Sequence, residues 1–128
     1  MIEETLSIHF ASRPEIRLAY LFGSQATGKT NAMSDVDVAV LIDPTAFEGS
    51  APYGYKAHLG TELMQLLKTN RVDVVILNDA GYFLRHRVLA QGKNIFAKSE
   101  LERVRFEADT MSRYPDIRRL MSAHWKES

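Results

Sequence analysis

The chain has 128 residues, of which 45% are hydrophobic and 25% are charged, so it has the size and composition of one globular domain. It contains no cysteine, which excludes disulfides, thiolate zinc sites, iron–sulfur clusters and a cysteine nucleophile. No apolar run approaches the roughly 18 residues that span a bilayer, and the acidic N-terminus lacks the basic start of a secretory signal. We therefore expect a single cytoplasmic domain over residues 1–128.

Charge is balanced over the whole chain but not along it. Residues 1–80 carry 6 Lys/Arg against 10 Asp/Glu, a net charge of −4, and residues 81–128 carry 10 against 6, a net charge of +4. A total of zero argues against a nucleic-acid binder that neutralises phosphates. The uneven halves indicate either solvated helix faces, or an acidic metal-binding end and a basic end that meets an anion or an acidic partner.

Hydrophobic periodicity predicts alternating helices and short strands. In chain order we expect a helix at 2–12, strands at 17–22 and 35–42, a loop at 44–54, a helix at 55–68, a strand at 71–77, a short helix at 80–91 and an edge strand at 94–97. A C-terminal helix over about 99–125 begins at Ser99, which forms a capping box with Glu102, and Pro115 should kink or interrupt it. This order predicts an α/β (α+β) domain with helices around one small mixed sheet of three to four strands.

A phosphate-loop motif follows the first predicted strand but lacks the structure that the motif requires. Residues 23–30, GSQATGKT, match the pattern G-x-x-x-x-G-K-[ST] in full. The lysine and threonine of a true phosphate loop open a helix, which crosses back to a parallel strand over a dozen or so residues. Here residues 31–34 alone separate Thr30 from the next predicted strand, so we interpret the match as a decoy.

Three aspartates on two predicted strands form a better candidate site. Asp35 and Asp37 are two residues apart, and because side chains alternate along a strand, both should point to one face of the sheet. Asp is disfavoured in strands, and such conflicts with local propensity tend to mark function. Asp73 stands between Val72 and Val74, and we expect it to face inward among apolar residues. The cluster suits Mg²⁺, which binds oxygen ligands and substrate phosphates; the alternative is three solvated strand-end aspartates.

A glycine–serine pair, Gly23-Ser24, precedes the aspartate pair by ten residues. A glycine after a strand lets the backbone approach a ligand closely, and the serine offers a hydroxyl and a backbone N–H to phosphate oxygens. Gly-Ser alone is common in turns that end strands. The spacing Gly-Ser, ten residues, Asp-Val-Asp is far more specific and indicates a nucleotide-phosphate site beside a metal site.

These motifs resemble the signature of the DNA polymerase β-type nucleotidyltransferases. The resemblance rests on FGS at 22–24, SDVD at 34–37 and the later Asp73, and the short chain is similar to their minimal nucleotidyltransferase (MNT) group. Residues 84–96, LRHRVLAQGKNIF, are similar to that group's last helix and strand, so the resemblance covers nearly the whole chain. It implies a polymerase β-like fold and nucleotidyl transfer from ATP.

The resemblance also implies a role for each site residue. Two Mg²⁺ ions would be held by the three carboxylates, and the outer phosphates of ATP by the glycine–serine loop. The implied metal-binding and catalytic residues are Asp35, Asp37 and Asp73, and the implied nucleotide-binding residues are Gly23, Ser24 and Lys29. Thr27 stands where family members often carry an arginine.

At this size, we expect no second domain that could hold an acceptor. Minimal nucleotidyltransferases that resemble this chain are commonly antitoxins, which add AMP to a tyrosine of a HEPN ribonuclease toxin. The resemblance therefore implies an Mg²⁺-dependent protein adenylyltransferase in a hetero-oligomer with a HEPN-type toxin, without stable nucleic-acid or membrane binding. The alternatives are a contact-only antitoxin with a vestigial site and a small-molecule, aminoglycoside-type adenylyltransferase.

The C-terminal helix is where we expect the partner to bind. Arginine and aromatic residues favour interface hot spots, and the predicted helix is rich in arginines beside apolar side chains. These residues are Arg103, Arg105, Arg113, Arg118 and Arg119, with Phe106, Met111, Leu120 and Trp125. Two weaker candidates are the basic cluster Arg85–Arg87, as a solvated face or a nucleotide contact, and Tyr53 and Tyr55, which either stack on a base or simply pack.

Overall fold

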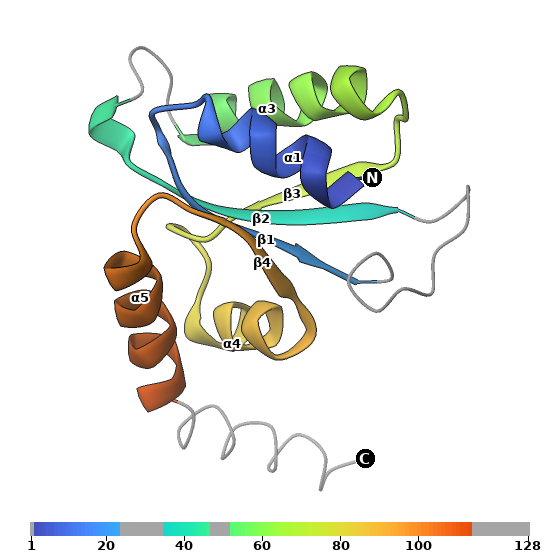
Figure 1. The fold of residues 1–128 in the computed structure, drawn as a ribbon. Coiled ribbons are helices and arrows are strands. Elements are labelled where there is room, and N and C mark those ends of the chain that lie inside the picture. Colours follow the sequence, from blue (N-terminus) through green and yellow to red (C-terminus); the bar gives the residue numbers. More distant parts are fainter. Residues whose placement is uncertain (1, 24–34, 47–51, 114–128) are drawn as a thin grey trace, which may run out of the picture.

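The computed structural model of the protein describes residues 2–23, 35–46 and 52–113. Its elements, in chain order, are α1 (Ile2–Ala11), β1 (Ile16–Phe22), β2 (Val36–Ile42), a 3-10 turn η1 (Pro44–Ala46), α3 (Pro52–Leu67), β3 (Val72–Ile76), α4 (Tyr82–Gln91), β4 (Lys93–Ala97) and α5 (Glu100–Ser112). The four strands form one sheet in the order β3-β2-β1-β4 (Figure 1). Strand β1 is antiparallel to β2 and β4, whereas β2 and β3 are parallel. The predicted small mixed sheet is confirmed.

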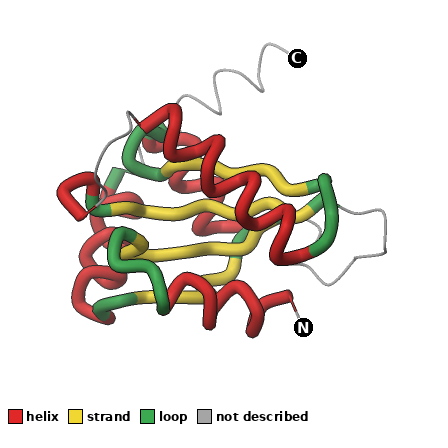
Figure 2. The backbone as a smooth tube through the Cα atoms, turned by 90° about the horizontal axis from the view of Figure 1, so that it is seen from above, coloured by secondary structure: helices red, strands yellow, loops and turns green. Residues whose placement is uncertain are grey.

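Helices cover both faces of the sheet. Helices α1 and α3 lie on one face, and α4 and α5 lie on the other (Figures 1 and 2). Strand β2 shows why, because its side chains alternate: Val38 and Val40 join the buried cluster under α1 and α3, and Ala39 joins the cluster under α4. By the same alternation, Asp37 shares the sheet face of Ala39. The aspartate site therefore belongs to the α4 and α5 side of the molecule.

The predicted loop over 44–54 is too long, because α3 already begins at Pro52. Proline suits the first turn of a helix, since its φ is pre-set and its missing N–H would have no partner there. Tyr55, the first residue after this predicted loop, is fully buried in α3. Its hydroxyl donates a 2.8 Å hydrogen bond to the Glu15 carboxylate. Tyr55 therefore packs in the core and is not placed to stack on a base.

Helix α5 begins as predicted, at a serine cap. The hydroxyl of Ser99 accepts a hydrogen bond from the backbone N–H of Glu102 at 3.2 Å. The Glu102 carboxylate accepts a 2.7 Å hydrogen bond from Arg17 of β1, so it anchors the helix to the sheet. The helix ends at Ser112 with Arg113 as its C-cap, and residues 114–125 of its predicted range, with the predicted kink at Pro115, lie outside the described residues. Within the described ranges, none of the helices is long and apolar enough to cross a membrane.

Candidate active site

The three predicted aspartates lie at one end of two neighbouring strands. Asp37 and Asp73 are direct partners in the parallel register of β2 and β3. Asp35 stands immediately before β2, and its side chain is 64% exposed. Because β2 and β3 run in the same direction, their starts meet at the same end of the sheet. This pairing brings sequence-distant carboxylates together beside the end of β1, where Phe22 is the antiparallel partner of Asp37.

The predicted inward orientation of Asp73 is wrong. Asp73 is exposed, whereas Val74 is buried and packs, with Val72, in the cluster under α1 and α3. Alternation places a side chain between two core valines on the opposite face, and β3 is the edge strand of the described sheet. The Asp73 carboxylate is consequently open to solvent and to any group that approaches this edge.

The electrostatics of the site centre on Asp37, which is half-buried. Burial raises the pKa of the Asp37 carboxyl above its ordinary value, and the negative charges of Asp73 and Asp35 raise it further. Asp37 is therefore close enough to both of the other carboxylates to be repelled by their charges. A bound cation would relieve this repulsion, and hard oxygen ligands are those that Mg²⁺ prefers. The donor set thus fits the metal that the sequence predicts.

Arg71 is a neighbour of the site that the sequence reasoning missed. Its guanidinium Nη1 lies 3.5 Å from Asp35 Oδ1, and its backbone C=O accepts a 2.8 Å hydrogen bond from the N–H of Val36. Its position two residues before Asp73 was the available signal, because residues two apart near one strand share a side. Among the described residues, no three His, Asp or Glu side chains are already gathered as metal ligands. At least one of the three aspartates would have to move to complete such a set.

Gly23 supports Asp37 through its backbone shape. Its φ is +75°, a conformation that L side chains rarely adopt, and a Cβ at this position would collide with Asp37 Oδ2. Sequence reasoning assigned this glycine to close approach of a ligand; the structure shows that it also makes room for the carboxylate. Ser24 and Lys29 lie outside the described residues. The antiparallel pairing of β1 with β2 supports the decoy interpretation, because a phosphate-loop helix connects two parallel strands.

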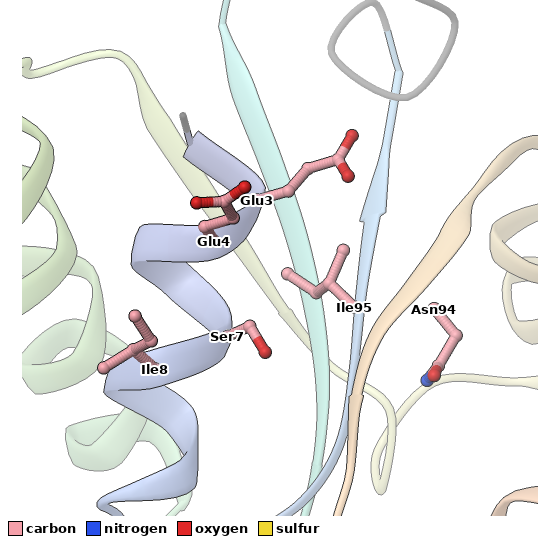
Figure 3. A pocket seen from close by; sticks show the side chains of 6 residues that line it. All are labelled: Glu3, Glu4, Ser7, Ile8, Asn94 and Ile95. Atoms are coloured by element: carbon pink, nitrogen blue, oxygen red, sulfur yellow. The ribbon is translucent and has the colours of Figure 1, made fainter.

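A cavity adjoins the aspartate end of the sheet. It has a volume of about 390 Å³ and lies between α3 and β3, where Asp73, Gly60 and Lys56 are among its lining residues. A second cavity, of about 360 Å³, lies between α1 and β4 at the opposite edge of the sheet (Figure 3). Its lining contains none of the predicted site residues: it is formed by Glu3, Glu4, Ser7, Ile8, Asn94 and Ile95. The first cavity therefore touches Asp73 at the edge of the sheet but lies on the α1 and α3 face, opposite the face that Asp37 shares with Ala39.

The basic cluster on α4 is explained in part by packing. The Arg85 guanidinium lies 5.3 Å from the ring centroid of Tyr82 and 5.4 Å from that of Phe106. Its Nε also donates a 3.0 Å hydrogen bond to the C=O of Leu77, which follows β3. Arg85 therefore joins α4, α5 and the end of β3, and this role accounts for it without a nucleotide contact.

Comparison with known proteins identifies the family of the chain. A family profile described as "Polymerase beta, Nucleotidyltransferase" matches residues 4–101. The protein adenylyltransferase MntA of Shewanella oneidensis is 32% identical over 104 residues, which are 81% of this chain and 70% of that protein. MntA of Aphanizomenon flos-aquae is 28% identical over 113 residues, which are 84% of this chain and 74% of that protein.

Solved structures extend the likeness to the whole fold. A chain of a toxin–antitoxin complex with AMP-PNP superposes with a TM-score of 0.79 at 26% identity, over 99% of this chain and 98% of that one. A chain of the complex between tri-AMPylated Shewanella oneidensis HEPN toxin and MNT antitoxin superposes with a TM-score of 0.69 at 25% identity, over 98% and 94%. Motifs, fold and relatives agree, and the chain belongs to the polymerase β nucleotidyltransferase family.

Proposed function

We propose that this chain is the antitoxin of a HEPN toxin–antitoxin pair and transfers AMP from ATP to a tyrosine hydroxyl of its toxin. The observation that carries the proposal is the register pairing of half-buried Asp37 with Asp73 where β2 and β3 begin; burial raises the pKa of the Asp37 carboxyl, and the charges of Asp73 and Asp35 raise it further. Charge repulsion of this kind costs stability unless a cation is bound there, so it favours a functional site. The named relatives are protein adenylyltransferases, which supports this acceptor class.

The carboxylates would hold divalent metal at this position. Asp35, Asp37 and Asp73 supply only oxygen donors, and we infer that they hold two Mg²⁺ ions together with the triphosphate. When bound, such ions supply charge neutralisation at the triphosphate and at the attacking and leaving oxygens of an in-line displacement. One of the solved neighbours is a toxin–antitoxin variant in which two aspartates, two positions apart, are replaced by glutamates. That spacing equals the spacing of Asp35 and Asp37.

The chain's own residues would bind, orient and accept a proton. In the transfer, the acceptor oxygen forms a bond to the α-phosphorus, the bond from that phosphorus to the bridging oxygen breaks, and pyrophosphate leaves. The proton of the acceptor hydroxyl passes to Asp73, which is exposed at the edge strand and thus open to an incoming side chain. Gly23 and Ser24 would hold the outer phosphates, since a backbone without a Cβ and a hydroxyl suit close phosphate contacts.

The proposal is tested by the mass of the partner. The chain is incubated with ATP, Mg²⁺ and the HEPN-type protein encoded beside it, and the intact mass of that protein is measured before and after. We expect one or more AMP additions with the wild-type chain and none with the double variant Asp35→Asn/Asp37→Asn. A toxin that is inhibited without gaining mass would replace the proposal with contact-only neutralisation. AMP addition to an aminoglycoside, with none to the protein, would support the small-molecule alternative.

Ser24 and Lys29 separate the nucleotidyltransferase site from a phosphate loop. If the phosphate-loop match is a decoy, Ser24→Ala should weaken ATP use more than Lys29→Ala, because the serine would contact the phosphates directly. In a true phosphate loop the lysine reaches the β- and γ-phosphates, so its loss would be the graver one. Titration of both variants with ATP and Mg²⁺ measures the difference. Loss of ATP binding in Lys29→Ala alone would reverse the assignment.

A further inference from the structure

Helix α5 carries a line of apolar side chains that points away from the rest of the domain. Leu101, Val104, Ala108 and Met111 follow one another at spacings of three, four and three residues, which we call the α5 seam. Leu101, Val104 and Met111 are 58%, 51% and 48% exposed, and Ala108 is exposed as well. Leu101, Val104 and Met111 are three of the five large exposed hydrophobic side chains among the described residues. Single exposed apolar residues are ordinary, but a continuous line of them marks an interaction surface.

The α5 seam does not pack in the hydrophobic core, because the opposite side of the helix makes the contacts with the sheet. Phe106 packs in the cluster under α4, and Thr110 is fully buried. Tyr20 of β1 donates a 2.7 Å hydrogen bond to Glu107, and burial together with this carboxylate raises the pKa of the Tyr20 hydroxyl. The helix is thus fixed on the sheet with its seam turned outward. A surface held rigidly in this way loses little entropy when a partner binds.

The spacing identifies the kind of partner. Alternating steps of three and four residues are the a and d positions of a heptad, and such a line packs against another helix. The seam covers only two heptads, and a coiled coil needs at least three or four to be recognised as one. A stripe of four residues also buries far less area than the roughly 1,200–2,000 Å² of a stable interface. Two copies of this chain joined by their seams alone would therefore be weak, and a larger partner with additional contacts is favoured.

The charged residues beside the seam restrict the chemistry of the partner's surface further. Arg105 is exposed next to Val104, and no side chain within the described ranges forms an ion pair with it. By contrast, Arg103 on the other side is engaged by Glu100 at 2.8 Å and Glu107 at 3.0 Å. In helical pairs, charges that flank the apolar line select the partner. Arg105 therefore favours a partner helix with an acidic side chain at its flank.

We infer that the α5 seam receives an amphipathic helix of the HEPN-type partner, with an apolar a/d line against the seam and an acidic residue opposite Arg105. The partner's identity in this inference rests on the proposed function. The position of α5 relative to the aspartates supports this partner. Its hydrogen bonds to β1 are made first at Arg17 and then at Tyr20, so the helix runs towards Phe22, the register partner of Asp37. A protein docked along α5 therefore lies on the sheet face from which Asp37 emerges.

The binding test uses seam variants and a matched control. Leu101→Glu and Val104→Glu place a charge in the seam. Ile8→Glu places one on a helix on the other sheet face, where Ile8 is 74% exposed, more than either seam residue. We expect each seam variant to raise the Kd for the HEPN-type partner at least tenfold, with ATP affinity and melting temperature unchanged. Arg105→Glu should also raise the Kd and reduce its salt dependence. Wild-type affinity in both seam variants would overturn the inference.

The identity of the occupant is tested by crosslinking. A photoreactive amino acid in place of Val104, in the complex with the HEPN-type partner, should give a crosslink to a helix of that partner, and one in place of Ile8 should not. A crosslink to a second copy of this chain, or to its own residues 114–128, would overturn the inference. The two proposals can fail independently of each other. A partner that binds the seam but gains no AMP contradicts the proposed function. The docking site is contradicted if both seam variants transfer AMP as efficiently as the wild-type chain at a limiting concentration of the partner.

Discussion

Asp37→Asn should abolish AMP transfer to the partner and leave the fold intact. The substitution keeps the shape of the side chain but removes the charge at the centre of the carboxylate group, between its register partner Asp73 and the nearby Asp35. Loss of one charge-stabilising group at a transition state typically costs about 10²–10³-fold in rate, and we expect at least that loss here. The measurement is the rate of mass gain of the HEPN-type partner with ATP and Mg²⁺. A variant that transfers AMP at the wild-type rate would remove Asp37 from the site.

The same variant should change how stability depends on pH. Burial and the neighbouring carboxylates raise the pKa of Asp37 above its ordinary value of 3.8, so the folded state binds this proton more tightly than the unfolded state. The stabilising contribution is therefore complete below the ordinary pKa and is lost as the pH rises through the raised one. At neutral pH without metal, Asp37→Asn should be as stable as the wild type or more stable. Thermal unfolding from acidic to neutral pH measures this, and Mg²⁺ should stabilise only the wild type.

Gly23→Ala should damage both the fold and the reaction. The backbone of Gly23 has a φ of +75°, and forcing an alanine into this region costs about 1–2 kcal/mol of folding free energy. The new methyl group would also collide with Asp37 Oδ2 and displace the carboxylate. Because catalytic groups act only within a narrow range of positions, we expect transfer to fall about 10²-fold even where the protein is fully folded. Urea unfolding and the partner-mass assay measure the two effects.

Gly60→Ala is the matched control for this glycine. Gly60 lies inside α3, and a Cβ at this position meets nothing within 4 Å. Alanine is preferred to glycine in a helix by about 0.5–1 kcal/mol, so this variant should be more stable and should transfer AMP at the wild-type rate. Equal loss of activity in the two variants would show that added bulk, and not the backbone shape of Gly23, causes the defect.

The order of elements could be predicted from the sequence because its signals are local. Apolar alternation marked the strands, the Ser99 cap marked the start of α5, and the three strands required one small sheet. The spacing of Gly23 to Asp37 identified the family, since a turn followed by two same-face carboxylates is a local arrangement. The boundary of α3 was the exception, because Pro52 is compatible with both a loop and the first turn of a helix.

Only the tertiary structure decided how these parts meet. The parallel pairing of β2 with β3 makes Asp37 and Asp73 direct partners, and the edge position of β3 turns Asp73 to solvent, although it stands between two core valines. The contact of Gly23 with Asp37 likewise depends on strand register. Helix α5 has the apolar seam on one side and Phe106 on the other, and which side meets the core is decided by the anchors that Tyr20 and Arg17 provide on β1. Pairing, register and docking are non-local, so the residues concerned carry no signal of them in their own neighbourhood of the chain.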